Sequence, residues 1–199
     1  MTKFYIKKVL LTGFFCTISY FASAQNDFVV TMENDTIRGQ AITGLFGGAV
    51  KKFIPVSGGK IKVKPDKIKE YYISSSQKNM VAKITPGTTR EIFLERLEKG
   101  SIELYELNRT HYHYSAYGGG TTSRQVNWYV SKAGAPIVLL KHNSWLTFSK
   151  DRRKNEFFDL IKDNQELADR FTTSDKFSFK EIKSLISLYN EDARRKPQR

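Results

Sequence analysis

Cysteine is almost absent from this sequence. Cys16 is the only one among 199 residues, and it lies in an N-terminal segment that we expect to be removed. The rest of the chain then has no thiol, which excludes disulfides, thiol catalysis and cysteine-bound metals. A domain of this kind has to be held together by its hydrophobic core alone.

Long hydrophobic runs are missing as well. The longest apolar stretch, 9–21, is interrupted by Thr12, Gly13, Thr17 and Ser19. It falls short of the roughly 20 apolar residues that span a bilayer, which argues against a membrane anchor. A lipoprotein is also disfavoured, because the bulky Phe14 and Phe15 precede Cys16 where the lipoprotein peptidase needs small residues.

The same N-terminus has the three parts of a secretory signal peptide. A positive region comes first, then the short apolar run, and then the small residues Ala22-Ser23-Ala24. The sequence therefore predicts cleavage after Ala24, which leaves Gln25 as the first residue of an exported protein. We expect it in the periplasm, on the cell envelope or secreted, with no membrane-spanning segment.

Residues that carry catalysis are scarce. The chain has three histidines, His111, His113 and His142, and it lacks both the GxSxG and the HExxH motifs. Carboxylate pairs for glycoside cleavage stay open because their pairing is spatial. The nearest candidates lie on charge-alternating strands and are interpreted as solvated: Glu91, Glu95, Glu103 and Glu106. We expect neither an enzyme nor a cofactor.

What the chain does have is positive charge. The formal net charge is +13, and removal of Lys3, Lys7 and Lys8 with the signal peptide lowers it to +10. Such a protein attracts anionic surfaces. Export excludes nucleic acid and leaves anionic lipid, acidic glycans or an acidic envelope protein as partners. The plainer alternative is that the charge only aids solubility.

Residues 25–148 are typical of a β-rich domain. Short β-prone runs are separated by turns such as Asn34-Asp35, Lys99-Gly100 and Ala133-Gly134, and apolar residues alternate at Val126, Trp128 and Val130. About nine or ten such strands favour an antiparallel β-barrel or sandwich.

Residues 149–193 change to a helical period. Ser149, Asp163 and Ser178 are predicted to begin three helices, the last two with a capping-box glutamate three residues later. Ile182, Leu185, Ile186 and Tyr189 form one apolar face. The predicted class is therefore α+β, with the helical segment packed on the sheet and a basic tail at 194–199.

Two stretches resemble exported, uncharacterised β-rich proteins of the Bacteroidota. They are the opening Val30-Thr31 with Asn34-Asp35-Thr36-Ile37 and Gly39, and the run from Phe93 to Leu97 that leads into Gly100. A Tyr-Asn pair near the end of the helical tail, here Tyr189-Asn190, is similar too. The resemblance implies a β-rich exported protein and no activity.

One segment stands out, at 111–120. His111, Tyr112, His113 and Tyr114 are followed by Tyr117 and three glycines. Tyrosines offer flat amphipathic contact area, so this segment is a candidate ligand-binding loop for glycan or lipid. The alternatives are a long hairpin loop without function and a metal held by the two histidines with His142; we expect no metal.

These observations lead to one leading hypothesis. We expect a non-catalytic exported protein that binds another envelope component. The alternative is a glycan- or lipid-binding module that uses the Tyr/His-rich loop 111–120.

Overall fold

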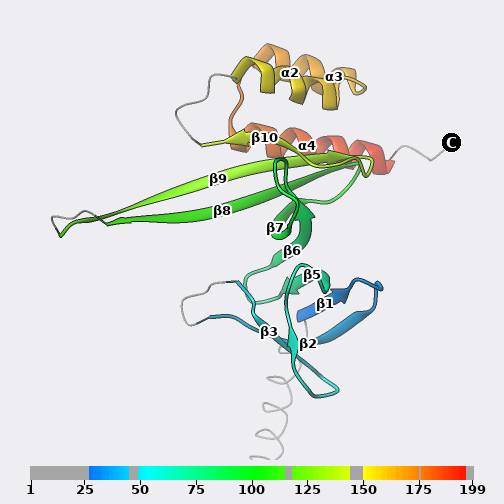
Figure 1. The fold of residues 1–199 in the computed structure, drawn as a ribbon. Helices are drawn as coiled ribbons and strands as arrows, with labels where there is room; N and C mark the ends of the chain where they lie inside the picture. Colours follow the sequence, from blue (N-terminus) through cyan, green and yellow to red (C-terminus); the bar gives the residue numbers. More distant parts are fainter. Residues whose placement is uncertain (1–26, 45–48, 115–117, 144–149, 175, 196–199) are drawn as a thin grey trace, which may run out of the picture. The chain divides into compact units, whose positions relative to one another are not determined.

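A computed structural model describes residues 27–44, 49–114, 118–143, 150–174 and 176–195 (Figure 1). The chain divides into two compact units between Ala82 and Lys83. This division falls inside the predicted β-rich region 25–148, so that the second unit combines strands with all the described helices.

Unit 1 is built from short antiparallel strands in the order β4-β3-β2-β1-β5-β6. Their bounds are β1 Asp27–Thr31, β2 Thr36–Ile42, β3 Lys52–Pro55, β4 Ile61–Lys62, β5 Ile68–Ile73 and β6 Lys78–Ile84, the last of which reaches across the boundary. The predicted first hairpin is confirmed, because β1 pairs with β2 and Asn34 takes the left-handed conformation (φ 69°).

Two residues of unit 1, Gly39 and Asp27, make close contacts between neighbouring strands. Gly39 in β2 approaches the backbone of Ile54 in β3 so closely that a Cβ would collide with its carbonyl oxygen. The buried Asp27 accepts hydrogen bonds from the backbone N–H of Ala41 (2.9 Å) and from the N–H and hydroxyl of Ser74 (2.8 and 2.7 Å). Its carboxylate thereby ties β1 to the ends of β2 and β5.

Unit 2 contains four strands in the order β7-β8-β9-β10, of which β8 and β9, with 13 residues each, are the longest. They are β7 Glu91–Glu98, β8 Ile102–Tyr114, β9 Gly120–Lys132 and β10 Val138–His142. The turn at Ala133-Gly134 is confirmed, with both residues at positive φ. β8 and β9 pair without interruption from Ile102↔Lys132 to Tyr114↔Gly120.

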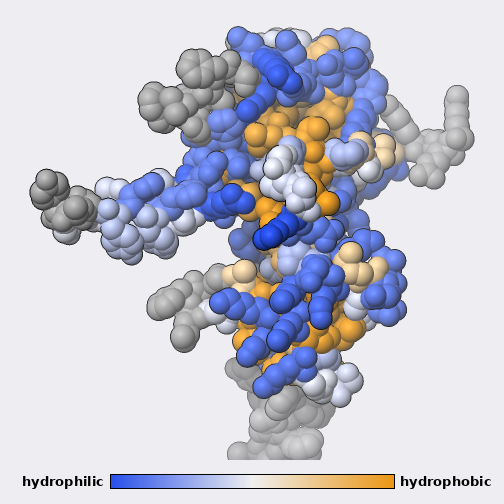
Figure 2. Space-filling view, in the orientation of Figure 1, coloured by the Kyte–Doolittle hydropathy of each residue, from blue (hydrophilic) through white to orange (hydrophobic). Residues whose placement is uncertain are grey.

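The described part of unit 2 also contains three helices: α2 Lys150–Ile161, α3 Gln165–Ser174 and α4 Phe179–Arg195. The predicted apolar face of α4 is confirmed, because all four of its residues are buried. They join Phe157 and Phe171 of α2 and α3 against Leu104 and Val130 of the sheet in one core. Figure 2 shows this hydrophobic region between the helices and the strands.

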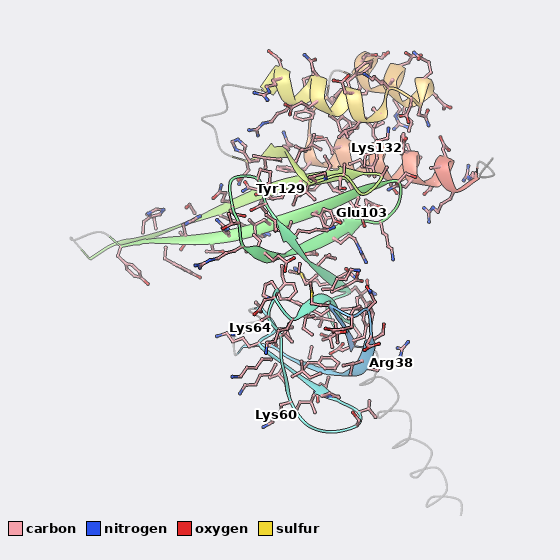
Figure 3. The ribbon with its side chains drawn as sticks, turned by 45° about the vertical axis from the view of Figure 1, so that its right-hand side comes forward. Arg38, Lys60, Lys64, Glu103, Tyr129 and Lys132 are labelled. Carbon is pink, nitrogen blue, oxygen red and sulfur yellow. The ribbon has the colours of Figure 1, made fainter. Side chains whose placement is uncertain are left out.

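Polar contacts fix the helices to the sheet at one end. The ammonium of Lys132 in β9 donates to both carboxylate oxygens of Asp163 (2.9 Å each) and to the carbonyl oxygen of Leu160 (2.6 Å). The hydroxyl of Tyr189 donates to the same carboxylate at 2.7 Å. Lys132 thus lies where β9, α4 and the α2–α3 connection meet (Figure 3).

The helix caps were predicted in part. Ser178 caps α4, because its hydroxyl accepts from the N–H of Glu181 at 3.1 Å. The prediction for α3 is wrong: Asn164 accepts from the N–H of Leu167 at 3.3 Å, while Asp163 is engaged by Lys132. The predicted cap Ser149 lies outside the described residues.

The β-rich, antiparallel character of the fold and its helical segment are confirmed. The closed form is not: within unit 1 the outermost strand β4 does not pair with β6, nor does β7 pair with β10 in unit 2. These open orders do not confirm the predicted barrel or sandwich, because a barrel pairs its first strand with its last. No helix among the described residues has the length and apolar character needed to cross a membrane.

Candidate functional site

The outer halves of β8 and β9 form a two-stranded ribbon that leaves the body of unit 2 (Figure 1). We call it the arm and define it as Asn108–Tyr114 and Gly120–Arg124. Every described residue of the arm is exposed, whereas Ile102–Tyr105 and Trp128–Ser131 in the inner halves of these strands are mostly buried. In Figure 2 the arm is coloured as hydrophilic, in contrast to the hydrophobic region between the helices and the strands. The arm is therefore the part of unit 2 that is most available to a partner.

The pairing register decides which side chains share a face of the arm. Residues directly opposite in an antiparallel pair lie on the same face, and neighbours along a strand alternate. Tyr112 and Tyr114 therefore continue the face that carries Leu104 and Trp128 under the helices. The two tyrosines are 67% and 88% exposed, so the arm offers two aromatic rings in a row.

The histidines lie on the opposite face and are held by residues of β9. The Nε2 atom of His111 is 3.3 Å from Oε1 of Gln125, and that of His113 is 3.4 Å from the hydroxyl of Ser123. Imidazoles and tyrosines therefore face opposite sides, and one flat ligand cannot contact both sets.

The base of the arm is anchored more firmly than its outer part. The indole N–H of Trp128 donates to Glu106 at 2.9 Å, and its ring packs edge-on against Phe179 with centroids 4.7 Å apart. Asn143, just beyond β10, accepts from the N–H of Val126 and donates to the carbonyl oxygen of Arg124. Its side chain continues the pairing of β9 past the end of β10.

Beyond this base the edges of the arm have no strand neighbour in the described structure. β7 pairs with β8 over Leu104–Glu106, and β10 pairs with β9 over Asn127–Val130. From Asn108 outward, half of the backbone N–H and C=O groups of β8 point away from β9. This open edge can accept another extended chain.

The arrangement does not bring the three histidines together. His142 pairs with Asn127, whereas His111 pairs with Ser123, which is four residues and about 13 Å further along β9. Within the described residues no group of three His, Cys, Asp or Glu side chains is placed to hold a metal ion. Burial, with help from Arg153 and Lys141, lowers the pKa of His142.

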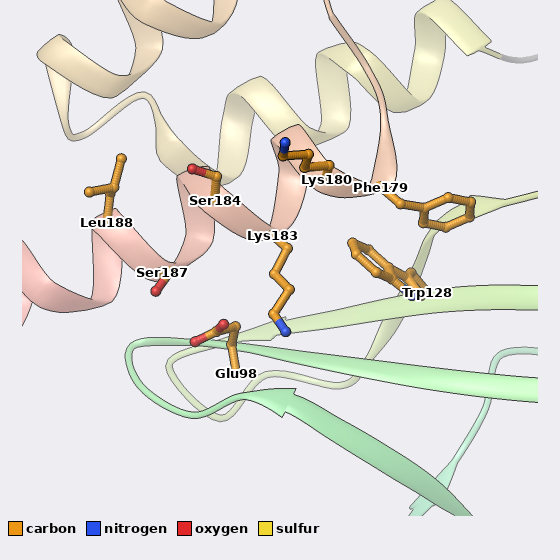
Figure 4. A pocket seen from close by; sticks show the side chains of 8 residues that line it. All are labelled: Glu98, Trp128, Phe179, Lys180, Lys183, Ser184, Ser187 and Leu188. Atoms are coloured by element: carbon orange, nitrogen blue, oxygen red, sulfur yellow. The ribbon is translucent and has the colours of Figure 1, made fainter.

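A groove of about 560 Å³ lies between α4 and the strands (Figure 4). Its apolar lining includes Trp128, Phe179 and Leu188, and Lys183 extends across it toward Glu98. Burial raises the pKa of Glu98, although the nearby charges of Lys183 and Arg194 act in the opposite direction. The groove adjoins the core that supports the base of the arm.

The acidic and serine residues that suggest catalysis are engaged or exposed. Glu103 accepts from the hydroxyl of Tyr105 (2.6 Å) and Glu106 accepts from Trp128, so both have structural partners. Two Ser-x-x-Lys spacings occur, at 57–60 and 75–78, and both lie in exposed turn regions instead of on one face of a helix. No nucleophile–base pair emerges from these residues.

The structure changes the interpretation of the segment 111–120. His111–Tyr114 and Gly120 are strand residues, so the prediction of a loop is wrong for them. Tyr117, Ala24 and Gln25 lie outside the described residues. The sequence predicted β9 only from Arg124 onward and missed Thr121–Ser123, because this polar part has no apolar alternation. The two β-branched threonines after Gly120 were the available signal.

No protein-family model, no curated protein and no solved structure matches this chain.

Proposed function

We propose that this chain is a non-catalytic exported protein that binds another component of the cell envelope through the arm. The observation that carries the proposal is the exposure of the arm from Asn108 to Tyr114 and from Gly120 to Arg124. The signal-peptide pattern and the net positive charge support an extracytoplasmic site of action.

A partner would stabilise the arm by pairing with its open edge. An isolated two-stranded ribbon is marginally stable in water, and its open edges attract further strands. A protein that adds an extended segment along the open edge of β8 would satisfy backbone groups there. Tyr112 and Tyr114 would give this contact its apolar area, since tyrosine is favoured at interfaces.

The test is photo-crosslinking in the cells that make the protein. A photoreactive amino acid replaces Tyr112 or Tyr114 on the arm, and Thr173, an exposed residue of α3, in a matched control. The proposal expects one dominant crosslinked envelope protein from the arm positions and none from Thr173. Equal products from all positions, or none from any, would overturn it.

A shortened arm checks that result without a crosslinker. Replacing residues 110–124 by Asn-Gly leaves Arg109 opposite Gln125 across a two-residue turn and keeps the register of the inner strands. Because the described residues of this stretch, 110–114 and 118–124, are all exposed, the melting temperature should stay within a few degrees while the partner no longer co-purifies.

A second candidate is a glycan- or lipid-binding module that uses the same tyrosines. The observation in its favour is that both rings are exposed on one face, where sugar rings can stack. Changing Tyr112 and Tyr114 to Ala would then abolish binding on a glycan array while thermal stability is unchanged. Binding that survives this change would exclude the second candidate.

A further inference from the structure

Unit 1 carries a dense group of lysines outside the arm. Seven lysines and a single acidic residue, Asp66, occur between positions 51 and 69. We define the lysine hairpin as residues 51–67, which comprise β3, β4 and their flanking turns. Its six lysines are all exposed, and none of their ammonium groups has a partner among the described residues: Lys51, Lys52, Lys60, Lys62, Lys64 and Lys67.

Two of these lysines oppose each other across the strands. Lys52 in β3 pairs directly with Lys62 in β4, so both ammonium groups leave the ribbon on the same face. Like charges in directly opposed positions are destabilising. Asp66, the one carboxylate of the lysine hairpin, lies in an exposed turn after β4 and outside both strands. An anionic surface that approaches this face attracts both ammonium groups and thereby offsets their mutual repulsion.

The tip of the lysine hairpin exposes one apolar side chain, Val56. Val56 is 64% exposed at the end of β3, directly before the turn Ser57-Gly58-Gly59, in which both glycines take left-handed φ values. A small apolar tip flanked by lysines suits the boundary between lipid head groups and acyl chains. Figure 3 shows Lys60 and Lys64 on the side of unit 1 away from Arg38, which concentrates the charge around this hairpin.

The kind of side chain distinguishes between anionic partners. The lysine hairpin contains no arginine and no exposed aromatic residue, since Phe53 is buried. Glycan recognition relies on aromatic stacking, and bidentate recognition of sulfate or phosphate relies on arginine. Lysines are point charges that respond to a diffuse negative surface.

We propose that the lysine hairpin docks this protein on an anionic lipid surface, with Val56 entering the head-group region. The proposal uses residues of unit 1 and does not depend on the arm. It adds a second attachment, to the membrane, beside the partner contact proposed above.

The test is co-sedimentation of the full chain without its signal peptide with vesicles of phosphatidylcholine, with and without phosphatidylglycerol. Binding is expected only with the anionic lipid and should be lost between about 0.1 M and about 1 M salt as the Debye length shrinks. Binding to neutral vesicles alone, or to neither kind, would overturn the proposal.

Two double variants that each remove two positive charges locate the surface. Lys52→Gln with Lys62→Gln should weaken binding roughly thirtyfold, since each lysine contributes about 1 kcal/mol at such a surface and 1.4 kcal/mol is tenfold. The same double change should leave the melting temperature unchanged or raise it, because it removes a like-charge pair. The matched control is Lys99→Gln with Lys176→Gln, two exposed lysines of unit 2.

The outcomes separate a docking surface from a general effect of charge. If the control variant loses as much affinity as the hairpin variant, net charge alone is responsible and the proposal fails. At the tip, Val56→Asp should weaken vesicle binding and Val56→Trp should strengthen it. If both tip variants bind the vesicles as the parent chain does, Val56 does not enter the head-group region and that part of the proposal is wrong. Preferential binding of the chain to an acidic glycan over the vesicles would instead favour a glycan partner.

Discussion

Asn190 shows how one side chain can replace a strand. It is 1% exposed in α4, accepts a hydrogen bond from the N–H of Ile102 at 2.9 Å and donates one to its carbonyl oxygen at 2.8 Å. Ile102 begins β8, at a point that the pairing with β7 does not reach. The amide of Asn190 therefore satisfies two backbone groups whose burial without partners would cost about 1–3 kcal/mol each.

Gly100 is the residue that lets Asn190 come so close. A Cβ at position 100 would collide with the side chain of Asn190. Gly100→Ala should therefore lower the free energy of unfolding by about 1–3 kcal/mol, as forced overpacking does. Chemical denaturation measures the effect. Gly119→Ala is the matched control, because nothing lies within 4 Å of a Cβ there and the change should be nearly neutral.

These roles were only partly accessible from the sequence. Asn34 and Gly134 were predicted as turn residues, since their types tolerate left-handed backbone. Tyr189 was predicted as an apolar helix position and is buried. Asn190 had no local signal, because its partner Ile102 lies 88 residues away. A polar residue next to an apolar face is normally solvated, and only tertiary structure shows otherwise.

Between elements, Asp163 carries the clearest dependence on pH. Burial raises the pKa of its carboxyl, but the hydrogen bonds from Lys132 and Tyr189 outweigh this and hold it below its usual range. A carboxyl whose pKa is lower in the folded state stabilises the protein above its unfolded pKa, about 4, and loses that contribution as pH falls. The effect is modest, since the Asp163 side chain is 55% exposed.

Asp163→Asn should therefore reduce stability at pH 7 by about 1 kcal/mol, and the difference from the parent chain should shrink as pH falls below about 4. Melting temperatures between pH 3 and pH 7 measure this. Asp159→Asn serves as the control, because Asp159 and its partner Lys162 are 62% and 59% exposed. A difference for Asp163→Asn that stays constant with pH would contradict the assignment.

The arm shows why strands can escape detection. The inner half of β9 was predicted from the alternation of Val126, Trp128 and Val130 in the sequence, and the structure buries Trp128–Ser131 on both faces. From Asn108 outward both faces of β8 meet solvent, so no alternation remains. The element exists because its register continues from a buried base, and a short sequence window does not contain that information.

At the scale of the molecule, the two units have cores of different size. Unit 2 buries fourteen hydrophobic residues in one cluster that joins strands and helices. The buried hydrophobic residues in the described part of unit 1 are fewer and lie on short strands or directly beside them: Val29, Val50, Phe53, Val63, Ile68, Tyr71 and Val81. Apolar burial is the main favourable term in folding, so unit 1 should be the less stable part.

This difference can be measured without dividing the chain. Trp128 belongs to unit 2, so that in a Trp145→Phe variant the tryptophan fluorescence reports on that unit alone. Far-UV circular dichroism reports on both units. In a urea titration we expect the dichroism to change first and the fluorescence to change at a higher midpoint, because the less stable unit 1 unfolds first. Coincident transitions are the mark of a single cooperative unit. Superimposed curves would show that the two units unfold together.

The pairing of Asn190 with Ile102 also bears on the order of events during biosynthesis. The two residues are separated by 88 positions, so β8 cannot receive this partner until the ribosome has made α4. Until then unit 2 lacks one wall of its core. A chain that reaches its stable state so late remains unfolded for longer, and this delay would favour the export proposed above.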